Sequence, residues 1–288
     1  MLTANSIWGL TTPMAKAVLL FESVTFLSLT SYRLLGAAVV FWIASFFTKK
    51  EKVSSHDLVL LFFASLFSIV FNQGFFMKGL SVTSPIDATI IATTTPIFTM
   101  IISAIYLKEE VTWVKIVGIL LGAGGALLLI LAGKSNAASA GNGLGNLLCM
   151  LAQLSFSIYL VMFKGLIDRF SPVTLMKWIF TFASLCFLPI SLQSMESVHY
   201  DALTTQILLY TAAIIFGGTF LSYLFVSVGQ HSLKPSVVSM YNYVQPVVAS
   251  VIAVLWGMDS FGLTKTIAVI LVFTGVFLVS KGKFQKER

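Results

Sequence analysis

The sequence predicts an all-α integral membrane protein in which ten transmembrane helices form two inverted five-helix repeats. Composition, the length of the apolar runs and an internal repeat lead to this prediction. Of the 288 residues, 57% are hydrophobic and 10% are charged, whereas a soluble domain has about 25% charged residues. Each apolar run is close to the roughly 20 residues that cross the hydrocarbon core of a bilayer. Because that core offers the backbone no water, isolated runs of this length must be helical.

The apolar runs are separated by residues that are costly in hydrocarbon or that interrupt helices. The charged stretch 49–52 cannot be buried cheaply, Pro85, Pro172 and Pro235 suit first helical turns, and the Gly-Asn-Gly stretch 141–143 does not sustain a helix. The predicted spans are 3–21, 24–47, 58–79, 85–107 and 111–132, followed by 143–165, 172–192, 206–229, 235–256 and 260–281.

The basic residues predict the orientation, because cytoplasmic loops are enriched in lysine and arginine. With the N-terminus inside, the cytoplasmic side has Lys49, Lys50, Lys52, Lys108, Lys115, Lys164, Arg169, Lys177, Lys234, Lys281, Lys283, Lys286 and Arg288. The outer side has only Lys16, Lys78, Lys134 and Lys265, and Arg33 lies within the second span. We therefore expect a bacterial-type inner membrane with both termini cytoplasmic. The net charge of +7 is a topology signal, and no nucleic-acid partner is expected.

The two halves of the chain share a pattern. A shift of 150 residues superposes Phe75 on Phe225, Gly79 on Gly229, Pro85 on Pro235, Pro96 on Pro246, Lys115 on Lys265 and Gly125 on Gly275. A shift of 148 superposes Ala4 on Ala152, Lys16 on Lys164 and Ser23 on Ser171. The predicted units are a first repeat (1–132), a linker (133–142), a second repeat (143–281) and a basic cytoplasmic tail (282–288). Because each repeat has five helices, the two run oppositely, as in many secondary transporters with a midplane substrate site.

The same alignment leaves the first helix short at its start. The stretch from the start of the sixth helix to Lys164 is about five residues longer than the stretch from Met1 to Lys16. Either the first helix is unusually short, or a few residues precede Met1 in the natural product.

These residues resemble the EamA-type branch of the drug/metabolite transporter superfamily. The matching residues are Trp8, Gly9 and Lys16 in the first span, Arg33 in the second, Pro96 in the fourth, Glu109 after it, and Gly118, Gly122 and Gly125 in the fifth. The second copy departs from the pattern, with Phe156, Thr181 and Asp259 in place of Trp8, Arg33 and Glu109. The resemblance implies a central cavity lined by helices 1, 3, 4, 6, 8 and 9, and export of amino acids, nucleosides, drugs or other metabolites.

Polar residues inside the apolar runs are the candidate substrate contacts, since an amide in hydrocarbon needs a partner. Ser239, Asn242, Tyr243 and Pro246 share one face of the ninth span, at i, i+3, i+4 and i+7, and Gln245 flanks it. The fourth span has an equivalent face. The predicted substrate-binding residues are Asn242, Tyr243, Gln245, Thr93, Thr95, Asn72, Gln73, Gln153, Tyr159, Tyr223 and Trp8, and Pro96 and Pro246 are predicted to kink or gate.

Each of these residues also has a structural interpretation. Threonines bond back to their own helix, amides hold helices together, and Trp8 can belong to an interfacial aromatic belt. Arg33 can pair with carbonyls, hold the repeat interface or attract an anionic substrate group. Glu109 and Glu110 favour the start of the fifth helix. The glycines of the fifth span favour internal helix packing over a possible homodimer.

No enzyme or cofactor is predicted. The three histidines, His56, His199 and His231, are widely separated, and all eleven acids fall in loops or near helix ends. This leaves no obvious mid-membrane proton relay, with Asp87, one turn into the fourth span, as the remaining candidate carrier. It also leaves no metal cluster and no nucleophile with a base. We therefore expect a secondary transporter that moves small organic metabolites, with the lipid bilayer as its surroundings. A non-transporting scaffold or sensor, or a membrane enzyme, is the alternative.

Overall fold

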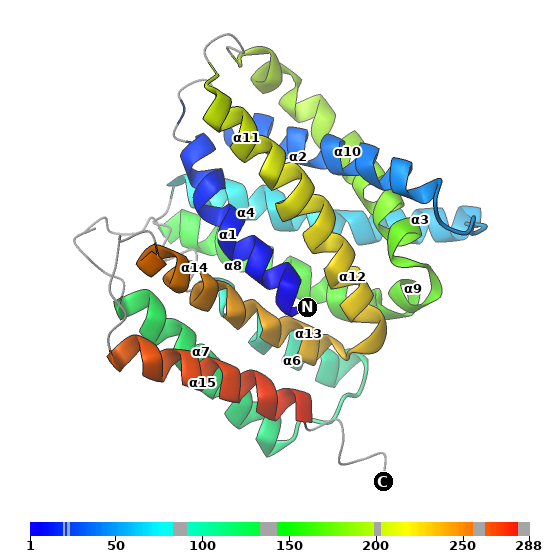
Figure 1. The fold of residues 1–288 in the computed structure, drawn as a ribbon. Coiled ribbons are helices and arrows are strands. Elements are labelled where there is room, and N and C mark those ends of the chain that lie inside the picture. The colour runs from blue at the N-terminus through cyan, green and yellow to red at the C-terminus, as the bar shows by residue number, and fades with distance from the viewer. Residues whose placement is uncertain are drawn as a thin grey trace.

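The computed structural model describes residues 1–19, 21, 24–82, 91–132, 143–198, 203–255 and 263–281. These residues fold into helices joined by short connections, and they contain no strand, which confirms the all-helical prediction (Figure 1). The predicted linker, the predicted tail and the start of the fourth predicted span lie outside the described residues.

The helical segments follow in chain order. They are α1 (Leu2–Leu19), α2 (Phe26–Ser45), α3 (Ser55–Ser65), η1 (Leu66–Val70), α4 (Phe71–Val82), α6 (Thr95–Tyr106), α7 (Trp113–Ala132), α8 (Gly143–Met162), α9 (Lys164–Arg169), α10 (Pro172–Glu196), α11 (Thr205–Ala213), η3 (Ile214–Leu221), α12 (Ser222–Ser232), α13 (Pro235–Met240), η4 (Tyr241–Tyr243), α14 (Val244–Leu255) and α15 (Leu263–Lys281).

Several stretches are long and apolar enough to cross a membrane. Among the described residues these are Phe26–Ser45, Ser55–Val82, Gly143–Met162, Pro172–Glu196 and Thr205–Ser232, and shorter apolar helices cover Thr95–Tyr106, Trp113–Leu128 and Thr266–Val279. The long helices begin where capping residues satisfy free backbone N–H groups. Thr25 forms a capping box with Ser28 at α2, Ser54 caps α3, and Pro172 opens α10 behind Ser171.

The charged stretch before α3 also caps another helix. The Glu51 carboxylate accepts hydrogen bonds from the Ser171 backbone N–H and hydroxyl at the start of α10. Partial burial alone would raise the pKa of Glu51, but hydrogen bonds from Thr174 and Ser171 outweigh it and lower the pKa. The loop before α3 is thereby fixed to the first turn of α10.

Two stretches that the sequence predicts as continuous helices are broken. In the fourth, residues 93–94 form a turn and α6 begins at Thr95, so Pro96 lies in a first turn. In the ninth, the 3-10 turn η4 separates α13 from α14, and Pro246 lies near the start of α14. Both prolines therefore follow an existing break, where the N–H that proline lacks is not needed, instead of bending an uninterrupted helix.

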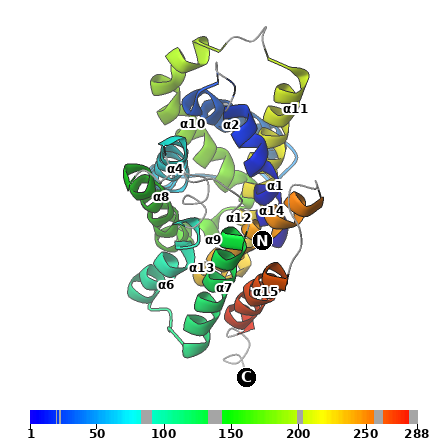
Figure 2. The same ribbon diagram turned by 90° about the vertical axis from the view of Figure 1, so that its left-hand side faces the viewer.

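The helices α7 and α15 pack side by side, away from α2 and α10 (Figures 1 and 2). A Cβ atom added at Gly118 would lie 2.9 Å from the Gly275 carbonyl oxygen, and one added at Gly125 would lie 2.6 Å from the Ala268 carbonyl oxygen. The glycine-rich face of α7 is thus occupied by α15 of the same chain. Gly122 instead receives the ring of Tyr243.

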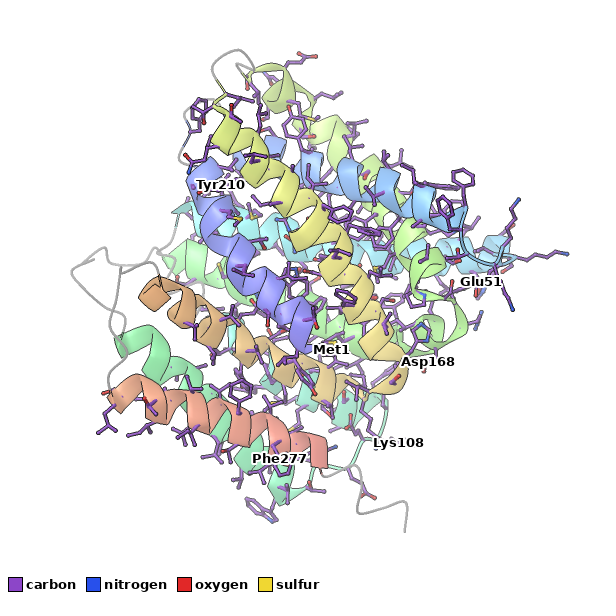
Figure 3. All side chains as sticks on the ribbon, viewed as in Figure 1. Met1, Glu51, Lys108, Asp168, Tyr210 and Phe277 are labelled. Atoms are coloured by element: carbon purple, nitrogen blue, oxygen red, sulfur yellow. The ribbon has the colours of Figure 1, made fainter. Side chains whose placement is uncertain are left out.

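Contacts between the two halves occur as matched pairs that are related by the two shifts found in the sequence (Figure 3 shows all the described side chains). Four pairs match: Gly79 against Cys149 and Gly229 against Met1; Thr95 bonded to Gln153 and Gln245 bonded to Asn5; Asn72 donating to the Ala152 carbonyl and Ser222 donating to the Ala4 carbonyl; and Gly118 against Gly275 and Gly125 against Ala268. The second contact of each pair is found from the first in the same way. The residue number of the first-half partner is raised by 150, and that of the second-half partner is lowered by 148 or 150.

Candidate functional site

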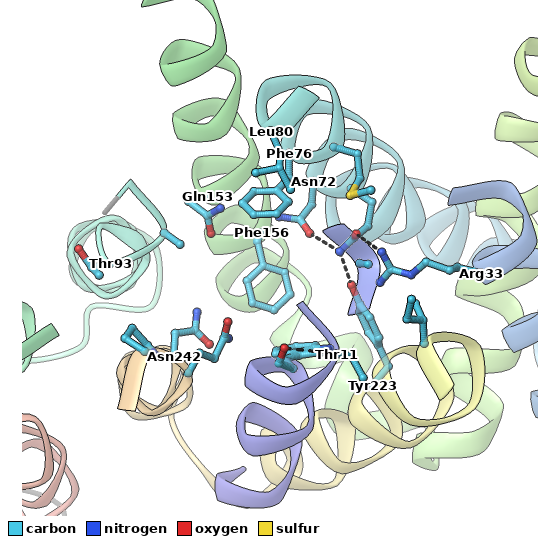
Figure 4. Close-up of a pocket in the computed structure, with 18 residues that line it drawn as sticks. Thr11, Arg33, Asn72, Phe76, Leu80, Thr93, Gln153, Phe156, Tyr223 and Asn242 are labelled. Carbon is cyan, nitrogen blue, oxygen red and sulfur yellow. Dashed lines mark hydrogen bonds between the residues drawn. The ribbon is translucent and has the colours of Figure 1, made fainter. Parts of the chain in front are cut away.

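A cavity of about 170 Å³ lies among α1, α4, α8 and α14 (Figure 4). At the ~15 Å³ that one water needs, it has room for roughly ten waters and hence for a small organic molecule. Its wall consists of Trp8, Thr11, Ala15, Arg33, Asn72, Gln73, Phe76, Met77, Leu80, Ala92, Thr93, Gln153, Phe156, Ile214, Tyr223, Asn242, Gln245 and Pro246.

Helical periodicity explains which residues reach the cavity. Trp8, Thr11 and Ala15 recur at i, i+3 and i+7 on α1, and Asn72 and Phe76 are four residues apart on α4. Both halves contribute residues, whereas α7 and α15 contribute none to this wall. The cavity therefore uses the helices that the family resemblance implies, with Arg33 of α2 added.

One wall is a polar network that joins three helices. The Gln73 amide nitrogen donates to the Tyr223 hydroxyl at 2.8 Å and to Asn72 Oδ1 at 3.2 Å. Arg33 Nη1 donates to Gln73 Oε1 at 3.5 Å, and Arg33 Nε donates to the Thr219 hydroxyl at 3.1 Å. Figure 4 shows the Arg33 guanidinium reaching from α2 toward the cavity and this network.

The π-helix η3 supplies part of this wall. A π turn hydrogen-bonds five residues back and often marks a functional site. Here Trp8 Nε1 donates to the Gly218 carbonyl at 2.8 Å, and the Trp8 ring packs edge-on against Tyr223 at 5.4 Å between centroids. Trp8 therefore lines the cavity. A second π-helix, η1, directly precedes α4, which carries Asn72 and Gln73.

The opposite wall has amides in different bonding states. Gln153 Oε1 accepts the Thr95 hydroxyl proton at 2.8 Å, and Gln245 Nε2 donates to Asn5 Oδ1 at 2.9 Å. The Asn242 side chain makes no hydrogen bond within the described part of the chain, although it lines the cavity. Its amide is therefore available to a bound molecule.

The structure brings most of the predicted site residues together. The cavity wall contains Trp8, Asn72, Gln73, Thr93, Gln153, Tyr223, Asn242 and Gln245, together with Pro246. Sequence reasoning did not include Thr11, Phe76, Phe156 or Ile214. The spacing of Thr11 and Ala15 from Trp8 is the signal that would have identified the α1 face.

Tyr243, Thr95, Tyr159 and Pro96 do not line the cavity. Tyr243 is fully buried against Gly122 of α7. The wall residues Asn242, Gln245 and Pro246 recur at i, i+3 and i+4, so the intervening Tyr243 lies on a neighbouring face. The Tyr159 hydroxyl donates to Gln230 Oε1 at 3.3 Å, away from the cavity. Thr95 is buried between α6 and α8, where it holds Gln153, and Pro96 follows it in the first turn of α6.

A second polar pocket lies at the end of the molecule where α6, α7 and α13 meet. Lys115 Nζ bonds to Glu109 Oε1 at 2.6 Å and to the Glu110 carbonyl at 2.8 Å, and the Ser236 hydroxyl donates to the same Glu109 oxygen. The exposed fractions of the Lys115 and Glu109 side chains are 9% and 7%. Glu109 thus connects the first turn of α7 to the first turn of α13, a cross-half contact beyond the predicted capping role.

Comparison with known proteins decides the family. A profile of the EamA-like transporter family matches residues 1–131 and 143–281. The chain belongs to the EamA-like transporter family. This confirms the resemblance to the drug/metabolite transporter superfamily, and together with the apolar helices it identifies a multi-pass membrane transporter.

Two of three reported relatives of this EamA protein carry transporter names. The chain is 28% identical over 197 residues to an uncharacterized transporter of Archaeoglobus fulgidus, covering 67% of each chain. It is 24% identical over 275 residues to the uncharacterized transporter YetK of Bacillus subtilis, covering 93% of this chain and 82% of YetK. It is also 26% identical over 289 residues to the chloroplastic WAT1-related protein At3g02690 of Arabidopsis thaliana, covering 95% of this chain and 66% of that protein.

A solved crystal structure has the same fold. It superposes with a TM-score of 0.78 over 99% of this chain and 96% of its own, at 15% sequence identity. At this identity the likeness concerns the fold alone.

Proposed function

We propose that this EamA protein is a secondary transporter that exports small organic metabolites, such as amino acids, related compounds or drugs, across a bacterial-type inner membrane by alternating access. The cavity carries this proposal, because residues of both halves surround one space between packed helices. Its mixture of aromatic rings and amides is typical of small-molecule sites, which are mostly apolar with a few polar groups that fix orientation.

Within this proposal the chain has ten transmembrane helices arranged as two inverted repeats, residues 1–132 and 143–281. The duplicated contacts support it, since unrelated halves would not repeat hydrogen bonds at matching positions. Gln73 and Tyr223, which are 150 positions apart, also bond directly to each other. Such a bond between equivalent residues is expected where a pseudo-two-fold axis passes between the repeats.

Alternating access then follows from the near-equivalence of the halves. If each half can adopt the conformation of the other, the cavity opens first to one side and then to the other. The breaks before Pro96 and Pro246, at equivalent positions, are the proposed points of flexion. The π-helices η1 and η3, also at equivalent positions, are further candidates.

Topology gives the first prediction. Lys50 precedes α3 beside the start of α10, and Ser197 follows the other end of α10. With Cys149 and Cys186 replaced by alanine, the Ser197→Cys variant should react with a membrane-impermeant maleimide in intact cells, and the Lys50→Cys variant should react only after lysis. Labelling of both positions in intact cells would contradict cytoplasmic termini.

The second prediction distinguishes an amide that is available to a substrate from one that is hydrogen-bonded to another residue. Asn242→Leu removes an amide with no protein partner in the described structure, so substrate affinity should fall by up to about tenfold, the worth of one neutral hydrogen bond, while thermal stability stays nearly unchanged. Gln245→Leu breaks the bond to Asn5 and should lower stability as well. Binding and melting assays on the purified variants distinguish them. Unchanged affinity in Asn242→Leu would remove this residue from the site.

A further inference from the structure

Arg33 brings a positive charge into the middle of a spanning helix. It is the eighth residue of the 20-residue helix α2, and its side chain lines the cavity. A guanidinium at such a depth is costly unless it meets water, polar groups or an anion. The cavity is therefore the place where the charge is accommodated.

The protein satisfies this guanidinium only in part. Of five N–H donors, the structure pairs Nε with the Thr219 hydroxyl and Nη1 with Gln73 Oε1, the latter at 3.5 Å. Both acceptors are neutral. Among the described residues, the three ion pairs join Lys115 to Glu109, Lys164 to Asp168 and Arg169 to Asp57, and none includes Arg33.

No acidic residue in the described part of the cavity wall faces this charge. The other wall residues that the structure describes have aromatic, aliphatic, hydroxyl or amide side chains, and none of them is an aspartate or a glutamate. The equivalent position in the second half is Thr181, which accepts a hydrogen bond from Trp42 on the far side of α2. One half alone therefore supplies a cation to a space that both halves enclose.

The two bonds that Arg33 does make hold its plane in place. Thr219 belongs to η3 and Gln73 to α4, so the guanidinium is fixed between two elements while its other N–H groups remain available. A planar fork of this kind matches the two oxygens of a carboxylate and forms charge-assisted hydrogen bonds with it.

We propose that the transported substrate carries a carboxylate, which binds to Arg33, while its apolar part lies against Trp8 and Phe156 and its other polar groups meet Asn242. This assignment rests on the proposed transport function and names the class of compound that it moves: small organic anions and zwitterions with a free carboxylate.

The test compares carboxylates with their neutral amides. Purified protein in proteoliposomes is assayed for transport of phenylacetate against phenylacetamide and of L-leucine against L-leucinamide, together with neutral nucleosides. The variants are Arg33→Gln, Arg33→Lys and, as a control that keeps the charge but loses one orienting bond, Thr219→Val. Size-exclusion profiles and melting temperatures establish that each variant is folded.

We expect transport of at least one carboxylate in preference to its amide. Arg33→Gln should remove the preference and weaken carboxylate binding by about 10- to 100-fold, as for a hydrogen bond to a charged group. Arg33→Lys should retain part of it, and Thr219→Val should retain most of it. If Arg33→Gln does not fold, the test is the reduced carboxylate preference expected of Arg33→Lys.

The results that would contradict the carboxylate assignment differ from those that would also contradict the transport function. Transport of nucleosides or amides with no preference for carboxylates, or an unchanged carboxylate preference in a folded Arg33 variant, would overturn the carboxylate assignment and leave the transport function standing. A folded, reconstituted wild-type protein that moves none of the compounds would overturn both.

Discussion

Glu109→Gln should lower the free energy of unfolding by about 3 kcal/mol, as expected when one partner of a buried ion pair is removed. The substitution leaves the Lys115 ammonium with a neutral side-chain amide and the Glu110 carbonyl as its nearest partners, and the Lys115 side chain is only 9% exposed. Apparent melting temperature of the purified protein in detergent, together with denaturant titration, measures the effect.

A double-mutant cycle separates the pair from its surroundings. Lys115→Met alone should also destabilise the protein, whereas Glu109→Gln combined with Lys115→Met should cost clearly less than the sum of the two single changes. The matched control is Asp168→Asn, which removes the anion of the pair with Lys164 at a side chain that is 47% exposed, and it should have a small effect. Additive single effects would show that Glu109 and Lys115 do not act as a pair.

Gly275→Ala should separate α7 from α15 and destabilise the protein by about 1–3 kcal/mol, the usual cost of overpacking. The added Cβ atom would lie 2.5 Å from the Gly118 carbonyl oxygen and 2.6 Å from the Gly122 backbone nitrogen. Neither backbone atom can move without shifting its helix.

The control for this prediction lies on the same helix pair. A Cβ atom added at Gly124 meets nothing within 4 Å, so Gly124→Ala should be neutral or stabilising because alanine favours helices. Both variants are compared by melting temperature and by monodispersity in detergent. Equal stability of the two variants would contradict the close packing of α7 on α15.

Much of this fold was predictable because lipid imposes simple rules. Apolar runs of spanning length give helices, and the 20-residue helix α2 lies within the predicted span 24–47. Two predicted helix starts were also confirmed, because Pro172 and Pro235 are the first residues of α10 and α13. The π turns η1 and η3 were not predicted, because composition does not distinguish a five-residue hydrogen-bond step from a four-residue one.

The candidate site was predictable as a set of polar residues but not in its register. Asn242 and Tyr243 were placed on one face of a regular helix, but in the structure Asn242 lines the cavity and Tyr243 packs against Gly122. Arg33 was visible as a costly charge, yet its position in the wall depends on how α2 packs beside η3. Tertiary packing decides which of these side chains face the cavity, and this cannot be predicted from local periodicity.

We expect transported molecules to pass through the cavity between the two halves. Ala92, the counterpart of Asn242 in the first half, lines this cavity, and Ala92→Trp should fill it without disturbing the helix pair α7 and α15. Uptake of a labelled metabolite panel into proteoliposomes is the direct measurement, with Gly124→Trp as a control in open space. We predict saturable uptake by the wild type and by Gly124→Trp, and background uptake by a folded Ala92→Trp variant. Undiminished uptake by Ala92→Trp would show that transported molecules do not pass through this cavity.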